Sequence, residues 1–175
     1  IDNPNDRIDA KKLRLASVLI GITDVDSPKV ILTKRSIHLE QHSGQIAFPG
    51  GKVEKNETAT EAAIREAEEE IGILSNEIEV CGYLDTYETG TGFRILPVVA
   101  FVKEKFTKKI NKLEVDELFE VPLEFILDSD NHVLKSGFWN GAVRHYYTIN
   151  YFDYNIWGAT AGMLVNLFDR IKSNA

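Results

Sequence analysis

The glutamates between residues 66 and 70 are the side chains whose type and spacing most clearly permit chemistry. Glu69 and Glu70 follow Glu66 by three and four residues. Because each helical residue turns about 100°, the three carboxylates would share one helix face, where they repel one another. A divalent cation relieves that repulsion, and carboxylate oxygens suit Mg²⁺ or Mn²⁺. The pattern is therefore consistent with a metal site.

The alternative is a solvated helix face, which spacing alone favours because Glu-rich exposed helices are common. On such faces Lys and Arg usually alternate with Glu. Here residues 68–70 are all Glu and only Arg65 lies nearby. Arg65 can neutralise and orient Glu69, or it can bond back to Glu57. Periodicity alone leaves both interpretations open.

The helix that would carry these carboxylates has clear end signals. Thr58 and Glu61 form a capping-box pattern at its start, and Gly72 is placed to end it in a left-handed cap. The preceding glycines, Gly50 and Gly51, would allow backbone carbonyls to approach a metal closely. The face opposite the carboxylates is apolar and is expected to pack on a sheet; it carries Ile64, Ala67 and Ile71.

The remaining chain is expected to be mostly strands. Apolar runs and alternation predict strands over residues 13–22, 30–34, 46–48, 77–86, 94–103, 117–121, 133–138 and 143–152. A loop is expected over residues 87–93, a short helix over 122–127 and a hairpin turn at 140–141. A last amphipathic helix is predicted over residues 160–171, with one apolar stripe: Met163, Leu164, Leu167, Phe168 and Ile171.

Length and composition limit the architecture. The 175 residues suit a single domain, 1–175, in which residues 1–12 form an N-terminal arm. Strands combined with two well-separated helices predict an α/β fold, an α/β/α sandwich around a mixed sheet. With a single cysteine, Cys81, no intrachain disulfide can form, and we expect Cys81 to be a small buried core residue.

Charge and hydropathy exclude several kinds of partner. The net charge of −7 argues against a nucleic-acid or anionic-membrane partner, since such proteins carry a basic face. No apolar run approaches the ~20 residues of a membrane helix. The sequence shows no signal peptide, and its last residues, 172–175, are not a peroxisomal address. A cytoplasmic location is therefore expected.

Residues 51–73 as a whole resemble the Nudix box, Gly-x5-Glu-x7-Arg-Glu-U-x-Glu-Glu-x-Gly-U, where U is aliphatic. Every fixed position matches: Gly51, Glu57, Arg65, Glu66, Ala67, Glu69, Glu70, Gly72 and Ile73. The resemblance implies the Nudix fold and metal ligation by Glu66, Glu69 and Glu70, joined by the carbonyl of Gly50. It further implies Mg²⁺- or Mn²⁺-dependent hydrolysis of a nucleoside diphosphate linked to another group, with Glu70, Glu69 and Arg65 as the catalytic set.

The general base is left open by this resemblance. Glu70 can take a proton from the attacking water, but in many Nudix enzymes a glutamate from a distant loop does so. The sequence offers Glu88, Glu114 and Glu117 as such residues and does not choose among them.

The segment before the box resembles the signature of the coenzyme A diphosphatase branch, Leu-Leu-Thr-x-Arg-Ser-x3-Arg-x3-Gly-x3-Phe-Pro-Gly-Gly. The matching residues are Arg35, Ser36, Gly44, Phe48 and Pro49. The second arginine of the motif is replaced by Glu40, which could not help to bind the 3′-phosphate of coenzyme A. The resemblance implies substrate contacts by Lys34, Arg35, Ser36, Gly44 and Gly51.

Other polar and aromatic residues have simpler explanations. His38 and His42 are expected to make loop hydrogen bonds, since hard-metal sites favour oxygen ligands. Tyr146 and Tyr147 are expected to pack at the core and its rim, and Trp157 in the core.

Three functions are compatible with the sequence. The first is a coenzyme A diphosphatase giving 3′,5′-ADP and 4′-phosphopantetheine. The second is a Nudix hydrolase of another nucleotide, such as ADP-ribose, NADH or a nucleoside triphosphate, which Glu40 keeps open. The third is a non-catalytic nucleotide-binding module, which the intact set of box carboxylates disfavours. A homodimer is compatible with the resemblance, but no sequence feature indicates one.

Overall fold

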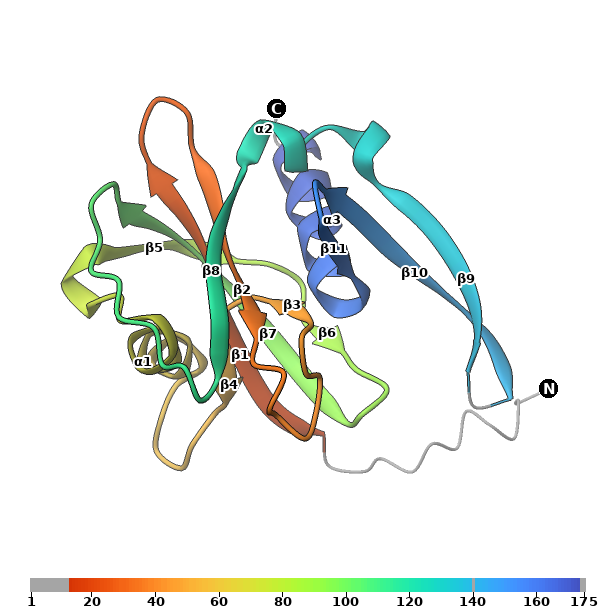
Figure 1. The fold of residues 1–175 in the computed structure, drawn as a ribbon, viewed down its shortest axis with the longest axis horizontal. Coiled ribbons are helices and arrows are strands. Elements are labelled where there is room, and N and C mark those ends of the chain that lie inside the picture. Colours follow the sequence, from red (N-terminus) through yellow and green to blue (C-terminus); the bar gives the residue numbers. More distant parts are fainter. Residues whose placement is uncertain (1–12, 140, 174–175) are drawn as a thin grey trace.

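A computed structural model describes residues 13–139 and 141–173 of the chain. The arm predicted over residues 1–12 lies outside the described residues. A large mixed sheet stands between two long helices, α1 (Ala59–Ile71) and α3 (Gly158–Ser173), and a small sheet projects beside α3 (Figure 1). This arrangement confirms the predicted α/β fold with a mixed sheet flanked by helices.

The large sheet is built around two long parallel strands. β1 (Arg14–Asp24) and β7 (Phe93–Lys103) run parallel, in register from Arg14 opposite Phe93 to Asp24 opposite Lys103. The main order is β3-β2-β1-β7-β5, with three further strands paired to β1, β7 and β2. The remaining bounds are β2 Lys29–Arg35, β3 Ile46–Ala47, β4 Gly50–Lys52, β5 Ile78–Tyr83, β6 Tyr87–Glu88 and β8 Val115–Pro122.

Each long helix covers one face of this sheet. Ala63 and Ala67 of α1 pack on Leu19, Val98 and Ala100 of the sheet, so small side chains bring the helix close to the strands. On the opposite face α3 contributes the buried residues Met163, Leu164, Val165 and Leu167. Ile171, the last residue of the predicted apolar stripe, is 42% exposed.

The small sheet consists of three antiparallel strands in the order β11-β10-β9. They are β9 (Val133–Trp139), β10 (Ala142–Tyr151) and β11 (Tyr154–Trp157). The pairing of β9 with β10 confirms the predicted hairpin, although residue 140 of its predicted turn lies outside the described residues. The strand β11 is not predicted from the sequence, because its four residues follow directly on the turn at residues 152–153. Short helical segments precede the hairpin: α2 (Leu123–Ile126) and a 3₁₀ turn (Ser129–Asn131).

Three local expectations are wrong. Cys81 is exposed, because the register of β5 against β7 shifts between Val80 and Gly82 and leaves Cys81 at the irregularity. Trp157 is 43% exposed, since it lies on the outer face of the small sheet against Tyr146. The expected loop over residues 87–93 begins with a short strand, β6, paired to β7.

None of the helices in the described part of the chain is long and apolar enough to cross a bilayer.

A second 3₁₀ turn (Ser75–Glu77) follows α1 and leads into β5.

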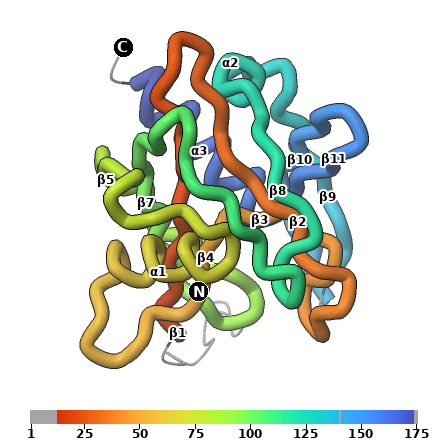
Figure 2. Tube along the Cα trace, turned by 60° about the vertical axis from the view of Figure 1, so that its left-hand side comes forward, coloured from red at the N-terminus to blue at the C-terminus, as the bar shows by residue number. Residues whose placement is uncertain are grey.

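The C-terminal end of α1 is fixed by the segment that joins β7 to β8, which passes beside it (Figure 2). Gly72 ends the helix with φ = 83°, as predicted, and its N–H donates to the carbonyls of Ala67 and Glu68. The N–H of Lys109 donates to the carbonyl of Ile71 at 2.8 Å. A Cβ on Gly72 would lie 2.6 Å from the backbone nitrogen of Lys109, so only glycine fits both the backbone angle and the space.

Gly72→Ala is therefore expected to lower the free energy of unfolding by about 1–3 kcal/mol, through left-handed backbone strain and the clash with Lys109. Urea unfolding measures the change. Gly90→Ala is the matched control, because a Cβ there meets no atom within 4 Å. Equal stability of the two variants would contradict this explanation of the helix end.

Candidate metal centre and active site

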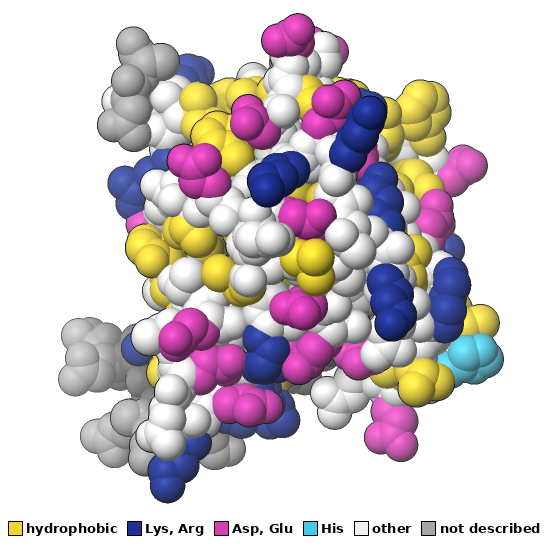
Figure 3. Space-filling model, turned by 90° about the vertical axis from the view of Figure 1, so that its left-hand side faces the viewer, with side chains coloured by type: hydrophobic (Ala, Val, Ile, Leu, Met, Phe, Trp, Pro, Cys, Tyr) yellow, Lys and Arg dark blue, Asp and Glu magenta, His cyan; other side chains and the backbone are white. Residues whose placement is uncertain are grey.

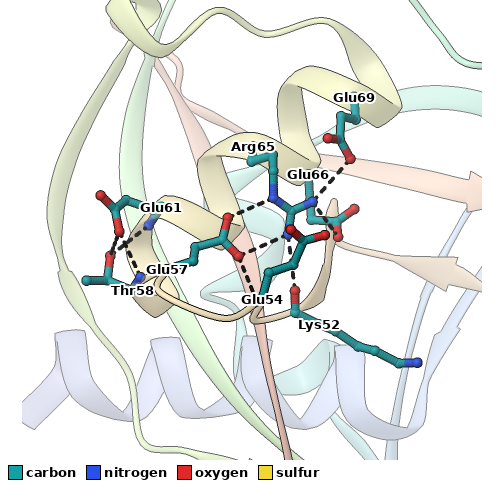
Figure 4. Close-up of polar contacts among 8 residues, drawn as sticks. All are labelled: Lys52, Glu54, Glu57, Thr58, Glu61, Arg65, Glu66 and Glu69. Atoms are coloured by element: carbon teal, nitrogen blue, oxygen red, sulfur yellow. Dashed lines mark hydrogen bonds and ion pairs between the residues drawn. The ribbon is translucent and has the colours of Figure 1, made fainter.

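The helix that carries the box carboxylates begins with the predicted capping box. The hydroxyl of Thr58 accepts from the N–H of Glu61 at 3.2 Å, and the Glu61 carboxylate accepts from the N–H of Thr58 at 2.7 Å (Figure 4). These two bonds satisfy N–H groups that the first helical turn leaves unpaired. The start of α1 is therefore set by residues close to one another in the sequence, Thr58 and Glu61.

Three carboxylates converge beside this helix. Oxygen atoms of Glu66, Glu70 and Glu114 all lie within 4.8 Å of one another. Glu70 is 4% exposed, and the other two are half-buried. Glu69 is not part of this group: its side chain is 55% exposed and pairs with Arg65. The structure thus brings together two of the three predicted ligands and adds Glu114 from a distant segment.

Arg65 holds the glutamates around it in place. Its Nε and one terminal nitrogen donate to both oxygens of Glu57, at 2.7 and 3.1 Å. Its other terminal nitrogen donates to Glu66 at 3.0 Å and to Glu69 at 3.2 Å (Figure 4). Both roles left open for Arg65 are therefore present. This face of the molecule shows acidic side chains gathered around basic ones (Figure 3).

The burial of Glu70 makes the group electrostatically unfavourable without a cation. Desolvation and the neighbouring charges of Glu66 and Glu114 raise the pKa of the Glu70 carboxyl to about 8, although the positive charge of Arg35 acts in the opposite direction. Desolvation also raises the pKa of Glu66. Three close oxygen donors, one of them deeply buried, fit Mg²⁺ or Mn²⁺.

Glu114 reaches the helix because Asn111 ties its segment to α1. The N–H of Asn111 donates to the carbonyl of Glu70 at 2.9 Å, and its side-chain amide donates to the Glu114 carboxylate at 2.9 Å. The side-chain oxygen of Asn111 also accepts from the N–H of Leu113 at 3.1 Å. The sequence analysis did not identify Asn111. An asparagine commonly accepts a hydrogen bond from the backbone two residues ahead, and a turn of this kind at Asn111 was the signal that could have found it.

The two glycines before α1 leave room for the carboxylates. A Cβ on Gly51 would lie 2.2 Å from an oxygen of Glu66, and one on Gly50 would lie 2.4 Å from the carbonyl oxygen of Ser17. The backbone of Gly50 also hydrogen-bonds the Glu70 carboxylate, which lowers the pKa of Glu70 against the effect of burial. Ligation of a metal by the Gly50 carbonyl, and substrate contact by Gly51, stay predictions.

The upstream motif lies against the segment that carries Glu114. The N–H of Ser36, which is fully buried, donates to the carbonyl of Glu114 at 2.9 Å. Gly44, with φ = 69°, closes the loop by donating to the carbonyl of Arg35 at 3.1 Å. The Nε of Arg35 is buried and has no hydrogen-bond partner among the described residues, although the charge of Arg35 acts on Glu70.

The other candidate glutamates, Glu88 and Glu117, are not part of the close carboxylate group. Glu88 pairs with Arg94 at 2.7 Å, and both side chains are about half exposed. Glu117 lies on β8, where its carboxylate accepts a hydrogen bond from the hydroxyl of Tyr154. Lys34 is opposite Glu117 in the β2–β8 ladder. His42 makes a loop hydrogen bond to Gln45 at 3.1 Å, as expected.

Comparison with known proteins defines the family. The NUDIX domain model matches residues 12–135. The chain is 37% identical over 155 residues to a protein of Escherichia coli named Uncharacterized Nudix hydrolase NudL, covering 88% of this chain and 81% of that protein. The protein of the same name from Yersinia enterocolitica is 36% identical over 163 residues, covering 90% and 81%. The chain belongs to the Nudix family and is a Nudix hydrolase.

Solved structures agree on the fold. An Ap4A hydrolase of C. elegans, in a binary complex, matches with a TM-score of 0.55 at 20% identity, over 62% of this chain and 80% of that one. A MutT/nudix family protein of Enterococcus faecalis matches with a TM-score of 0.58 at 17% identity, over 93% and 63%. At these identities the two structures establish the Nudix fold alone.

Asn111→Ala is expected to weaken Mn²⁺ binding by about 10- to 100-fold, because Glu114 loses the bond that orients it. Isothermal titration calorimetry with Mn²⁺ measures the change in the dissociation constant. Asn166→Ala is the matched control, since Asn166 also bonds a carboxylate, that of Asp85, at 2.9 Å. Equal Mn²⁺ affinity in both variants would show that Asn111 does not position the site.

The raised pKa of Glu70 predicts how stability depends on pH without metal. Between its ordinary pKa of 4.5 and its folded pKa of about 8, the folded protein binds more protons than the unfolded chain. The free energy of unfolding should therefore fall as pH rises through this window. Added Mg²⁺ should raise the melting temperature more at about pH 8.5 than at about pH 6, because metal binding requires the ionised carboxyl.

Thermal melts at the two pH values, with and without Mg²⁺, test this dependence. In Glu70→Gln the pH dependence should become shallower and the Mg²⁺ effect should shrink. A Mg²⁺ effect in the original protein that is the same at both pH values would contradict the role given to Glu70.

Proposed function

We propose that the chain is a Mg²⁺- or Mn²⁺-dependent diphosphatase of coenzyme A or its derivatives, giving 3′,5′-ADP and 4′-phosphopantetheine. The observation that carries the proposal is the contact between two parts of the molecule. Ser36 of the coenzyme A-type motif donates a backbone hydrogen bond to Glu114, and Glu114 belongs to the group formed with Glu66 and Glu70 of the box. This contact supports a single site that includes both the coenzyme A-type motif and the carboxylates.

The chain's own residues supply charge neutralisation and proton transfer at this site. Bound Mg²⁺ would neutralise the charge of the diphosphate and make the attacking water more acidic. Glu66, Glu70 and Glu114 would hold it, with Glu69 as the further predicted ligand. Of the four glutamates considered as the general base, Glu70 and Glu114 belong to the close group and Glu88 and Glu117 do not, so in our proposal Glu70 or Glu114 takes the proton of the water.

Arg35 is the residue best suited to bind a phosphoryl oxygen in this scheme. Its positive charge acts on Glu70, and its buried Nε offers a donor with no partner among the described residues. A charge-assisted bond to phosphate would satisfy that donor. Arg65 is occupied by Glu57, Glu66 and Glu69, so in our proposal it acts in catalysis by orienting these glutamates.

A second function is favoured by one observation. Glu40 is exposed at the position where the coenzyme A motif carries an arginine, so the cation that would meet a 3′-phosphate is absent there. Hydrolysis of a nucleotide without that phosphate, such as ADP-ribose or NADH, accommodates this difference.

Product analysis over coenzyme A, acyl-coenzyme A, ADP-ribose and NADH, with Mg²⁺ and with Mn²⁺, tests these functions. We expect 3′,5′-ADP from coenzyme A. Glu70→Gln and Glu69→Gln should each lower kcat by at least about 100-fold with folding retained. Glu68→Gln is the control, because Glu68 is an exposed neighbour on the same helix outside the fixed positions of the box.

Three results would change the assignment. Intact coenzyme A after prolonged incubation with either metal would overturn the first function, and turnover of ADP-ribose or NADH in its place would establish the second. Stabilisation by a nucleotide without any product from the panel would indicate a binding module.

A further inference from the structure

The β9–β10 hairpin exposes a group of large apolar side chains that the hydrolytic site does not use. We call this group the hairpin patch. Its exposed fractions run from 44% to 76%, and its members are Val133, Leu134, Phe138, Trp139 and Val143. They lie on both faces of the hairpin, with Leu134, Phe138 and Val143 on one face and Val133 and Trp139 on the other, and large apolar side chains exposed together in this way commonly mark an interaction site.

The same hairpin ends the small sheet with an unpaired strand. In the order β11-β10-β9, β9 has no partner on its outer side among the described residues, and it lies along the outer side of the sheet (Figure 1). Sheet proteins usually protect such edges with charges, prolines or bulges. The seven residues of β9 include one charge, Lys135, and no proline, so within residues 13–139 and 141–173 nothing protects this edge from pairing.

The sequence of β9 is complementary to itself when read in the opposite direction. Its residues are Val-Leu-Lys-Ser-Gly-Phe-Trp, with Ser136 at the centre and two large apolar residues at each end. Antiparallel pairing with an identical strand about Ser136 would place Leu134 opposite Phe138 on one face. On the other face it would place Val133 opposite Trp139. Opposite residues in an antiparallel pair share a face and contact each other.

We propose that a second copy of this chain binds here, with β9 pairing antiparallel to β9 of the other copy about a two-fold axis at Ser136. The two small sheets then form one continuous sheet across the dimer. A two-fold interface must use the same surface on both copies, and a strand complementary to itself meets that condition without any other element.

Charge disfavours the register centred on Lys135. Pairing about Ser136 places Lys135 opposite Gly137, which offers no like charge and leaves space for the lysine stem. A shift that centred the pair on Lys135 would set two ammonium groups opposite each other, which is unfavourable. It would also leave Trp139 beyond the end of the partner strand. The register at Ser136 uses all seven residues.

Sedimentation velocity over a concentration series tests the dimer. The original chain is expected to show a monomer–dimer equilibrium, and Phe138→Lys should weaken it by at least about tenfold, because a charge enters a paired apolar position. Phe152→Lys is the matched control: Phe152 is 85% exposed but lies at the turn between β10 and β11. A monomer at every concentration, or equal weakening by both variants, would overturn the proposal.

Disulfide trapping tests the register without requiring that a β9 charge variant fold. In a Cys81→Ser background, which removes the native cysteine, Ser136→Cys should cross-link two chains on oxidation. In a pair centred on Ser136 the two Cα atoms lie about 4.5–5.5 Å apart, within disulfide reach. Lys135→Cys should not cross-link, because it faces Gly137 instead of its own copy. Equal cross-linking of the two variants, or none in Ser136→Cys, would overturn the paired strand.

Discussion

Mutual repulsion among Glu66, Glu70 and Glu114 is the constraint on which the rest of the site depends. Their oxygens lie within 4.8 Å, and burial of Glu70 deprives that carboxyl of the water that would otherwise screen it. Burial, which is the largest cause, and the charges of Glu66 and Glu114 raise the pKa of the Glu70 carboxyl to about 8, so its protonated form is favoured at neutral pH without metal. A divalent cation favours the ionised carboxyl instead, so the three carboxylates are unfavourable together without metal and favourable with it.

Packing and hydrogen bonds hold the carboxylates together against this repulsion. Arg65 neutralises Glu66 from one side while it is itself fixed by Glu57. Asn111 ties the segment of Glu114 to the last turn of α1. The helix cannot move away from the sheet without losing its alanine contacts. The carboxylates are therefore held in place by contacts that the protein makes with its own residues.

Much of this centre could be predicted because it is local in sequence. The capping box, the glycine at the helix end and the face shared by Glu66 and Glu70 all follow from spacings within α1. Glu114 and Asn111 could not be assigned, since their position depends on a segment that folds back over the helix end. The errors at Cys81 and Trp157 have a similar origin: a register shift and an outward-facing sheet are tertiary features that residue type does not encode.

Anomalous diffraction from crystals soaked in Mn²⁺ tests the central claim most directly, because it locates the ion without reference to activity. The account predicts a manganese peak within coordination distance of carboxylate oxygens from Glu66, Glu70 and Glu114. Crystals of Glu70→Gln soaked in the same way should show a weaker peak or none. A strong peak elsewhere, with no density among these three carboxylates at saturating Mn²⁺, would contradict it.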